Sequence, residues 1–425
     1  MAEHRDRLIG FGLLALWAVY CTWGWWGTWG IDGSALYFAG ALWADGTPAA
    51  IYPPPSEFFW TATPPAWDAI ATTKGYPSAE LSPYVYPPIW AAVLAPVTGL
   101  LTAQGFFNLL TALTFAALAL GIWAAHSITR PQRCGFALWA GLSIVVLHSS
   151  VAVQFGVELK QPQILISVGT LVVVWLMQRG RDLSAGALLA FLAAIKLAPA
   201  GFALLFLFHK NWRALAAFAI VGGLLALFSL GTAGWPMHQA LLDRLSDLNG
   251  QVLVSSINYS LKSVLLVATE WMTGAMSADH TLPRFLVAPD WQVWTVRIIL
   301  AGALVWIWRW GQGASARSVP WRQAAALAIV FALTGPLGWA HYLILPLLVL
   351  PALLLALPSR TAILIGTCLV LAQSYRLTLW IFDQGASPYW PMFVGFGGAV
   401  ATLYLLSQPP GLTKSQADPT VPRID

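Results

Sequence analysis

Long apolar runs separated by short polar segments extend over most of this 425-residue chain. Runs of about 20 residues recur, and each can cross a hydrocarbon core of about 30 Å. Lipid does not tolerate unpaired backbone groups, and the runs are continuous and Leu/Ala-rich, which favours helices over a closed barrel. The pattern predicts an all-α membrane bundle of about 12 spans, at 8–26, 105–126, 134–152, 161–178, 183–195, 198–208, 214–231, 292–308, 321–338, 341–357, 361–380 and 391–407.

One apolar stretch, 183–208, is interrupted by the sequence from Lys196 to Pro199. It could form one long crossing or two half-length helices that meet at the break. A single crossing would move Lys210 to the side that is poor in basic residues, against the positive-inside rule. We therefore favour a broken hairpin buried within the protein, because lipid would leave its backbone groups unpaired.

The segment between the first two spans, 29–104, is rich in Pro, Trp and Tyr. Within it, 33–44 reads as a short helix whose Leu36, Phe38 and Leu42 suit the membrane surface. The apolar but Pro-interrupted stretch 87–101 is predicted to be re-entrant or to lie on the surface. If it crossed the membrane, the basic loop with Arg130 and Arg133 would lie outside, against the positive-inside rule.

Composition supports the membrane assignment. Only 9% of the residues are charged and 58% are hydrophobic, with a mean hydropathy of +0.69, whereas soluble domains carry about 25% charged residues. Most of the 24 Trp suit interfacial belts, and the three Cys are scattered without disulfide or metal spacing. The net charge of +5 is spread over short loops, so no nucleic-acid partner is expected.

Basic residues orient the chain in the membrane. They concentrate in short loops assigned to the cytosol, whereas the loop 29–104 holds five acids and only Lys74. This loop and the region 232–291 are therefore placed outside, and the tail 408–425 inside. The sequence predicts one transmembrane domain over 1–425, in the cell (inner or plasma) membrane, with its chemistry on the external or periplasmic side.

Asp32 is the first candidate for that chemistry. It follows the first span directly and is flanked by Gly30 and Gly33, which admit close approach. A carboxylate at the outer end of a span is well placed as a general base. The alternative is a helix-capping role at the start of the 33–44 helix.

Cationic candidates for binding an anion lie further along. Lys196 stands between two apolar half-spans and suits a phosphate, unless it snorkels from a helix end. His341 opens a span and could bind a phosphate or a sugar hydroxyl, or be structural. Lys262 and Arg376 are further polar candidates near the outer side. Arg376 should seek an anionic partner, and an ion pair with Asp383 is the alternative.

Amide side chains form a third group. Gln161 and Gln163 head a span and could contact sugar hydroxyls, although helix capping explains them nearly as well, and Asn258 lies in the second external region. No P-loop, dinucleotide fingerprint or zinc motif is present in the sequence, which therefore gives no support for nucleotide-driven chemistry.

Taken together, several short motifs resemble one family, the type-C (GT-C fold) glycosyltransferases related to the polyprenyl-phosphate-mannose-dependent alpha-1,2-mannosyltransferases that build phosphatidylinositol mannosides. The motifs run in order: Asp32 with Tyr37-Phe38-Ala39-Gly40-Ala41 and Gly46 to Tyr52, Tyr86-Pro87-Pro88 with Pro96, Gln161-Pro162-Gln163, Ile195-Lys196-Leu197-Ala198-Pro199, Asn258-Tyr259-Ser260-Leu261, and Trp339-Ala340-His341.

The resemblance implies a hexosyltransferase, with mannose the expected sugar. Asp32 would deprotonate the acceptor hydroxyl, and Lys196, His341, Lys262 and Arg376 would hold the donor phosphate. Tyr37, Tyr86, Gln161, Gln163 and Asn258 would contact sugar or acceptor. It also implies interface helices in the first external loop and inversion at the sugar.

By the same resemblance, the partners would be a polyprenyl-phosphate sugar, a glycolipid or glycan acceptor and membrane lipids. Neither cofactor nor metal is expected, because basic side chains can neutralise a phosphate monoester leaving group, and we expect a monomer. The rival hypothesis is a transporter or flippase, which about 12 spans and a broken hairpin would suit. No internal repeat supports it, and a long first loop better suits catalysis at an interface.

Overall fold

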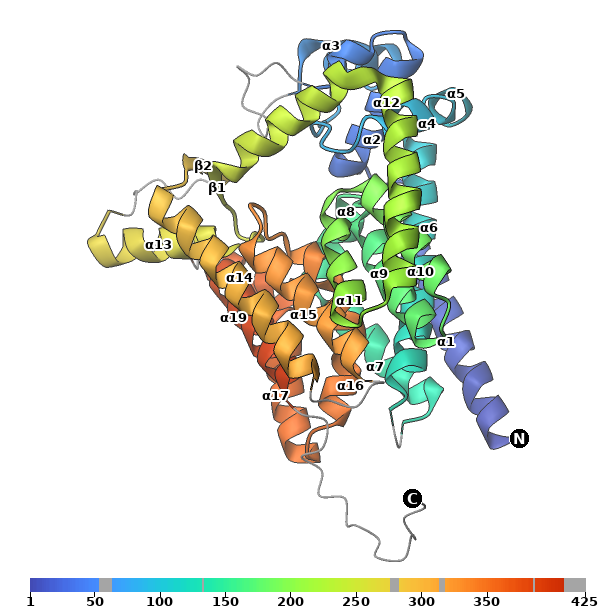
Figure 1. Cartoon of the computed structure of the whole chain (residues 1–425), viewed down its shortest axis with the longest axis vertical. Helices are drawn as coiled ribbons and strands as arrows, with labels where there is room; N and C mark the ends of the chain where they lie inside the picture. The colour runs from blue at the N-terminus through green and yellow to red at the C-terminus, as the bar shows by residue number, and fades with distance from the viewer. Residues whose placement is uncertain (53–62, 132–133, 276–282, 313–317, 385–386, 409–425) are drawn as a thin grey trace, which may run out of the picture.

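The computed structural model describes residues 1–52, 63–131, 134–275, 283–312, 318–384 and 387–408. These residues form an almost wholly helical molecule with a single two-stranded sheet (Figure 1). The predicted tail lies outside the described residues from 409 onward.

Five of the described helices are long and apolar enough to cross a membrane. They are α1 (Ala2–Gly24), α6 (Ala103–Thr129), α12 (Trp212–Asn249), α14 (Asp290–Gln312) and α19 (Trp390–Ser407). Their outer faces expose large apolar side chains, such as Leu16 (72%), Leu227 (66%) and Ile298 (69%). Water would not tolerate such a surface, so lipid must cover it. The prediction of a multi-pass helical membrane protein is confirmed.

The remaining predicted spans are shorter apolar helices. A helix of 14 residues such as α7 is about 21 Å long at 1.5 Å per residue, less than a hydrocarbon core of about 30 Å. The bundle is therefore confirmed, whereas its count of about 12 spans stays a prediction. These helices are α7 (Phe136–Ser149), α9 (Gln163–Gln178), α10 (Asp182–Ile195), α15 (Val319–Thr334), α16 (Ile344–Leu355) and α17 (Ser359–Ala372).

The centre of the bundle holds the most buried helices. Nearly every residue of α15 and α16 is buried, and both pack against α9. A helix that is apolar all round belongs inside a bundle. The loops at the ends of the bundle connect to these tightly packed helices.

The stretch 183–208 forms the predicted broken hairpin. Helix α10 ends before Lys196, and the chain returns through η2 (Ala198–Ala203) and α11 (Leu204–Phe208). Just after α11, Asn211 Nδ2 donates to Asp182 Oδ1 at the start of α10, over 2.7 Å. Both ends of the stretch therefore lie at one end of the bundle, and the break lies at the other.

The first loop is a compact, buried subassembly. The helix predicted over 33–44 is present as α2, but the expectation that its apolar side chains face the membrane surface is wrong. Leu36, Phe38 and Leu42 are at most 7% exposed, because α2 packs against the stretch 87–101 and α6. The loop helices are α2 (Ile31–Ala44), η1 (Pro48–Ala50), α3 (Pro65–Thr73), α4 (Ile89–Leu94) and α5 (Val97–Leu100).

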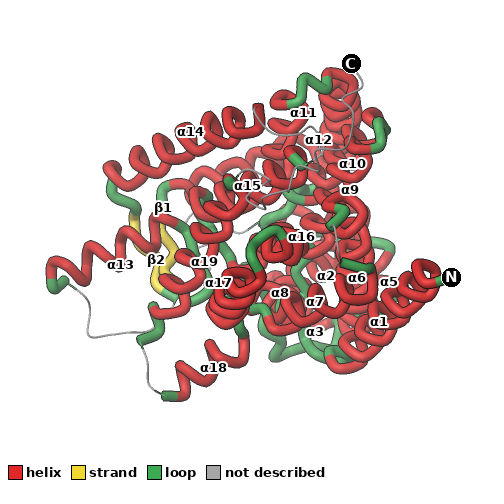
Figure 2. Tube along the Cα trace, turned by 90° about the horizontal axis from the view of Figure 1, so that it is seen from below, coloured by secondary structure: helices red, strands yellow, loops and turns green. Residues whose placement is uncertain are grey.

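Helix α12 leads from the bundle to the second loop region. Its backbone leaves helical geometry at Gly234, where φ is 73°, and the second half crosses the end of the bundle (Figure 1). There β1 (Gln251–Val254) pairs antiparallel with β2 (Arg284–Val287), and α13 (Leu261–Thr273) lies between them in sequence. Helices α13, α14 and α18 (Tyr375–Asp383) lie at the periphery in the view from below (Figure 2).

One predicted span is divided. The span 361–380 is not continuous, because α17 ends at Ala372 and α18 begins at Tyr375. Between them, the carbonyl of Gln373 accepts from the amide of Val151, which opens α8 (Val151–Glu158), over 2.6 Å. A tertiary backbone contact ends this helix where hydropathy alone would continue it.

Candidate active site

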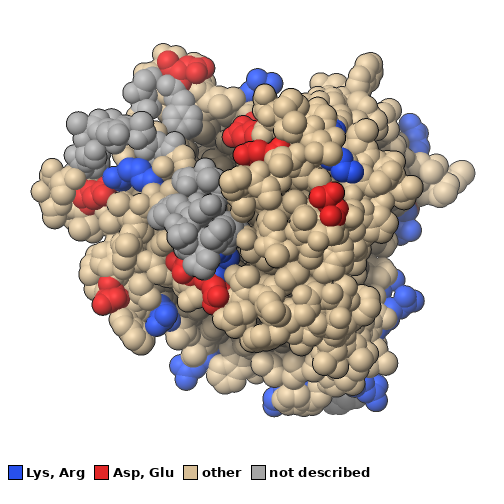
Figure 3. Space-filling view, turned by 90° about the horizontal axis from the view of Figure 1, so that it is seen from above, with Lys and Arg blue, Asp and Glu red and all other residues tan. Residues whose placement is uncertain are grey.

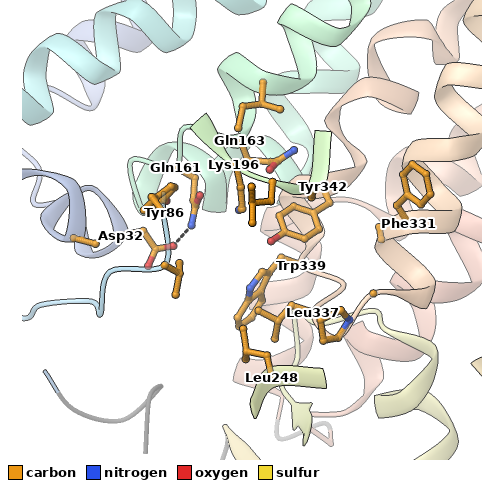
Figure 4. Close-up of a pocket in the computed structure, with 18 of the residues that line it drawn as sticks. Asp32, Tyr86, Gln161, Gln163, Lys196, Leu248, Phe331, Leu337, Trp339 and Tyr342 are labelled. Carbon is orange, nitrogen blue, oxygen red and sulfur yellow. Dashed lines mark hydrogen bonds between the residues drawn. The ribbon is translucent and has the colours of Figure 1, made fainter. Parts of the chain in front are cut away.

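A cavity of about 560 Å³ opens at the end of the bundle where α2 begins. Five segments meet there: the start of α2, the loop 80–86, the start of α9, the break 196–199 and the loop 335–342. The end of α12 and the paired strands β1 and β2 close the cavity from below in Figure 4. Seen from above, this end carries scattered single charges on a mostly uncharged surface (Figure 3).

Asp32 lines one wall of the cavity, in the first turn of α2. The helix is preceded by Gly30 at its N-cap, and no side chain caps it, so capping is not what the carboxylate does. Instead, Gln161 Nε2 donates to Asp32 Oδ2 (Figure 4). The amides and dipole of a helix start also favour a carboxylate in the first turn.

Opposing forces act on the acidity of Asp32. Burial raises the pKa of its carboxyl above the ordinary aspartate value, and this is the largest effect. Hydrogen bonds from Gln161 and Ser82 and the charge of Lys196 lower the pKa in part. A carboxylate whose pKa is raised is a better proton acceptor than an ordinary surface aspartate.

Tyr86 stands beside Asp32 on the same wall and is 2% exposed. Its backbone carbonyl accepts from the Tyr52 hydroxyl over 2.8 Å, and its ring lies 5.6 Å from that of Tyr84. Such aromatic packing fixes the ring in place. Tyr86 therefore offers a rigid aromatic face next to the carboxylate.

Lys196 lines the opposite wall, just past the end of α10. Its Nζ lies 4.7 Å from the centre of the Tyr342 ring, and the described residues hold no carboxylate within ion-pair distance of it. Gln163, the first residue of α9, lies next to it. This wall presents a cation and amide groups that a ligand could engage.

His341 lies behind this wall. It is 1% exposed and stacks on Trp339 at 6.3 Å between ring centres. Within the described residues neither of its ring nitrogens has a hydrogen-bond partner. Trp339 and Tyr342, its neighbours in sequence, line the cavity, whereas His341 does not.

Asn258 supports the loop that carries Trp339 but does not line the cavity. The residue is fully buried, and its Oδ1 accepts from the amide of Gly338 over 2.6 Å. Its Nδ2 donates to the carbonyl of Leu253 over 2.6 Å. A Cβ at position 338 would meet backbone atoms at 2.5 Å, which explains the glycine there.

Three other candidates lie away from the cavity. The Tyr37 hydroxyl is buried and donates to the carbonyl of Leu101 over 2.8 Å. Lys262 Nζ donates to the carbonyl of Asn249 at the end of α12 over 2.7 Å. Arg376 lines a separate groove with Trp23 and other residues. The ion pair of Arg376 with Asp383 is not formed among the described residues.

One part of the cavity is apolar. It is lined by Phe202 of η2, Phe331 and Ala332 of α15, and Leu345 of α16. An apolar pocket that adjoins a few convergent polar groups is the usual form of a small-molecule or lipid site. The site thus combines an acid, a cation and an apolar wall.

Several site residues were not singled out from the sequence. Ser82 donates to Asp32, but a serine in an irregular loop gives no signal. Trp339 and Tyr342 flank His341 in sequence, and that adjacency could have marked them as lining residues. Among the described residues, no group of three or more His, Cys, Asp or Glu side chains could hold a metal ion.

A family model described as Glycosyltransferase family 87 matches residues 84–337, which is more than half of the chain. The matched range contains the cavity residues Gln161 and Lys196, but Asp32 precedes it and Trp339 and Tyr342 follow it. No curated protein and no solved structure matches the chain. The chain belongs to glycosyltransferase family 87 and is a membrane glycosyltransferase.

Proposed function

We propose that this enzyme transfers a hexose, with mannose the expected sugar, from a polyprenyl-phosphate donor to a hydroxyl of a glycolipid or polysaccharide. The observation that carries the proposal is the arrangement of one cavity: Asp32 lies on one wall, Lys196 on the facing wall, and an apolar lining adjoins both. Asp32 is placed to accept the hydroxyl proton, Lys196 to bind the phosphate, and the apolar lining to contact the lipid.

The chemistry follows from those positions. Asp32 accepts the proton of the acceptor hydroxyl while that oxygen attacks the anomeric carbon. The bond between this carbon and the phosphate oxygen breaks, and its electron pair leaves with the polyprenyl phosphate. Lys196 stabilises the charge that develops on the leaving phosphate. Attack opposite to the leaving group inverts the sugar, so a beta-linked donor gives an alpha product.

The apolar lining supports a lipid donor. Phe202 belongs to η2, and Phe331 and Leu345 belong to the central helices α15 and α16. A polyprenyl chain could therefore lie among them with its phosphate at Lys196. Tyr86 and Trp339 provide flat faces for sugar rings near the carboxylate. Gln161 Oε1 is buried without a hydrogen-bond partner in the described residues, and it could accept from a sugar hydroxyl.

The wider setting is part of the same proposal. We infer a GT-C type arrangement in the cell membrane, with the cavity facing the external or periplasmic side, since the basic loops gather at the other end. The reaction needs no metal in this scheme, because cationic side chains act on the phosphate. We expect a monomer. Membership of a glycosyltransferase family does not favour the transporter alternative.

The test is the exchange Asp32→Asn in purified enzyme in lipid nanodiscs. We expect transfer from polyprenyl-phosphate mannose to fall by roughly 10²–10⁴-fold, because the amide cannot accept the proton. Asp45→Asn is the matched control, since Asp45 is exposed at the other end of α2. Normal transfer by the Asp32→Asn enzyme would remove Asp32 as the base.

The donor is tested by offering polyprenyl-phosphate mannose, glucose and arabinose to the unmodified enzyme. Mannose transfer is the expected result, and transfer of another sugar would correct the donor without removing the mechanism. Uptake of solute by proteoliposomes without any transfer would favour the transporter instead.

A further inference from the structure

The turn between α8 and α9 is bound closely to the start of α2. The carbonyl of Leu159 accepts from the amides of both Asp32 and Gly33, over 3.1 and 3.0 Å. Two residues later, Gln161 donates to the Asp32 carboxylate. This turn therefore holds the backbone and the side chain of the same aspartate.

Lys160 lies between those two contacts in sequence, and both its burial and its backbone conformation are unusual for a lysine. It is 3% exposed, and its backbone is left-handed with φ of 56°, which costs roughly 1–2 kcal/mol for a residue with a side chain. Burial also lowers the pKa of its ammonium to about 8. A buried cation on a strained backbone persists only where the surrounding structure holds it.

The ammonium of Lys160 holds the end of α1. Its Nζ donates to Thr28 Oγ1 over 2.7 Å and to the carbonyl of Trp25 over 3.4 Å. It also lies 5.5 Å from the centre of the Trp25 ring. These contacts fix the segment that links α1 to α2, only a few residues before Asp32.

The stem of Lys160 fits against two glycines at the start of α2. A Cβ at Gly30 would lie 2.0 Å from Lys160 Cγ, and one at Gly33 would lie 2.9 Å from Lys160 Cβ. Real Cβ atoms do not approach so closely, so both positions must lack a side chain while the lysine is in place. The α1–α2 link thus wraps around the stem of Lys160.

We propose that Lys160 is a positioning residue for Asp32: it ties the end of α1 to the start of α2 and so fixes where the carboxylate stands in the cavity. Lys160 does not line the cavity, so it acts through the backbone of α2. This inference rests on the proposed role of Asp32 as the base.

The test compares two lysine-to-glycine exchanges. Lys160→Gly and Lys210→Gly each remove a lysine from a left-handed backbone, since φ is 56° and 52°, and glycine suits both backbones. Lys210 is exposed at the other end of the bundle. We expect Lys160→Gly to lower kcat by roughly 10–100-fold with little change in the donor KM, because a displacement of about 1 Å can cost 10²-fold. Lys210→Gly should stay within about 2-fold.

A second readout does not require turnover. Hydrogen exchange at the amides of Asp32 and Gly33 reports their bonds to Leu159. We expect exchange in the peptide that contains them to rise in Lys160→Gly and not in Lys210→Gly. Should Lys160→Gly fold poorly, Lys160→Met keeps the stem between the glycines and removes only the ammonium contacts, and it should show the same faster exchange.

A double variant with Gly30→Ala distinguishes a loss of positioning by Lys160 from a general loss of stability. Gly30→Ala alone should lower kcat, because its methyl group would displace the lysine stem. In the Lys160→Gly background the clash is absent, so adding Gly30→Ala should change kcat by less than about 2-fold.

Unchanged kcat and unchanged exchange in Lys160→Gly would overturn the inference. The failure of the proposed function is distinct, because it requires Asp32→Asn to retain normal transfer. An inactive Asp32→Asn enzyme beside a fully active Lys160→Gly enzyme would leave the function standing and remove the positioning role.

Discussion

The two walls of the cavity are built in opposite ways. On the acid wall, the Asp32 backbone and carboxylate are bonded to the turn at 159–161, and aromatic rings brace Tyr86. On the cation wall, Lys196 stands at a helix break, with no described carboxylate within ion-pair distance and with its Nζ 4.7 Å from the centre of the Tyr342 ring.

In the proposed reaction, the difference follows from what each wall must do. A general base must be oriented before the acceptor arrives, so its bonds are made within the protein. A cation that binds phosphate must keep its hydrogen bonds for the ligand, because a protein carboxylate would compete with the phosphate. The acid wall is therefore called the bonded wall, and the cation wall is called the open wall. The predictions below test this division.

After the loss expected for Asp32→Asn, the largest effect is expected on the open wall. Lys196→Met should lower kcat/KM for a polyprenyl-phosphate sugar by roughly 10²–10³-fold, since loss of one partner of a desolvated charge pair costs about 2–5 kcal/mol. Lys196→Arg keeps the charge and should retain more activity than Lys196→Met. Equal losses in both variants would mean that shape, and not charge, is required at this position.

The next effect tests the support of the open wall. Asn258→Ala removes the bonds to Gly338 and Leu253 and leaves buried backbone groups unpaired. We expect the free energy of unfolding to fall by about 2–3 kcal/mol, with a raised donor KM because the Trp339 loop loosens. Thermal unfolding in nanodiscs measures the first effect, and an unchanged midpoint would contradict the role of Asn258.

A smaller effect concerns the pH dependence of kcat/KM, which the carboxylate on the bonded wall should control. In the proposed mechanism Asp32 works as a carboxylate, so the rate should fall as pH drops through its pKa. Gln161 lowers that pKa, so Gln161→Leu should raise it and move the acid limb of kcat/KM to higher pH, by about one unit if the bond contributes about 1.4 kcal/mol. Gln163 does not make that bond, so Gln163→Leu should leave the acid limb of kcat/KM unchanged.

The smallest effect is expected away from both walls. Lys262→Met removes the bond to the carbonyl of Asn249 at the end of α12. We expect a loss of about 1 kcal/mol in unfolding free energy, with the donor KM changed by less than about 2-fold. A large rise in KM would instead place Lys262 on the donor phosphate, as the sequence resemblance implies.

Local patterns in the sequence predicted much of the fold. Hydropathy located the apolar helices, and charge together with Pro199 located the break after α10. The burial of α2 was not predictable, because Phe38 is apolar whether lipid or protein covers it. The division of 361–380 was missed for a similar reason, since it depends on the distant amide of Val151.

The site was predictable where residue type is unusual for its surroundings. Asp32 and Lys196 stand out as charges beside apolar spans, and both line the cavity. Lys160 also stood at a span boundary, but its role depends on the fit to Gly30. Ser82 acts only through a neighbour that is remote in sequence. Such roles are properties of tertiary contact, which a single sequence does not display.

The hydrogen bond between Gln161 and Asp32 joins residues 129 positions apart, and Trp339 follows much later in the chain. A ribosome releases these parts in order, so the first span and α2 are synthesised well before the opposite wall exists. The complete cavity can form only after synthesis has passed Leu345. Enzyme that is still being inserted therefore lacks a complete cavity, and sugar transfer begins only with the assembled molecule.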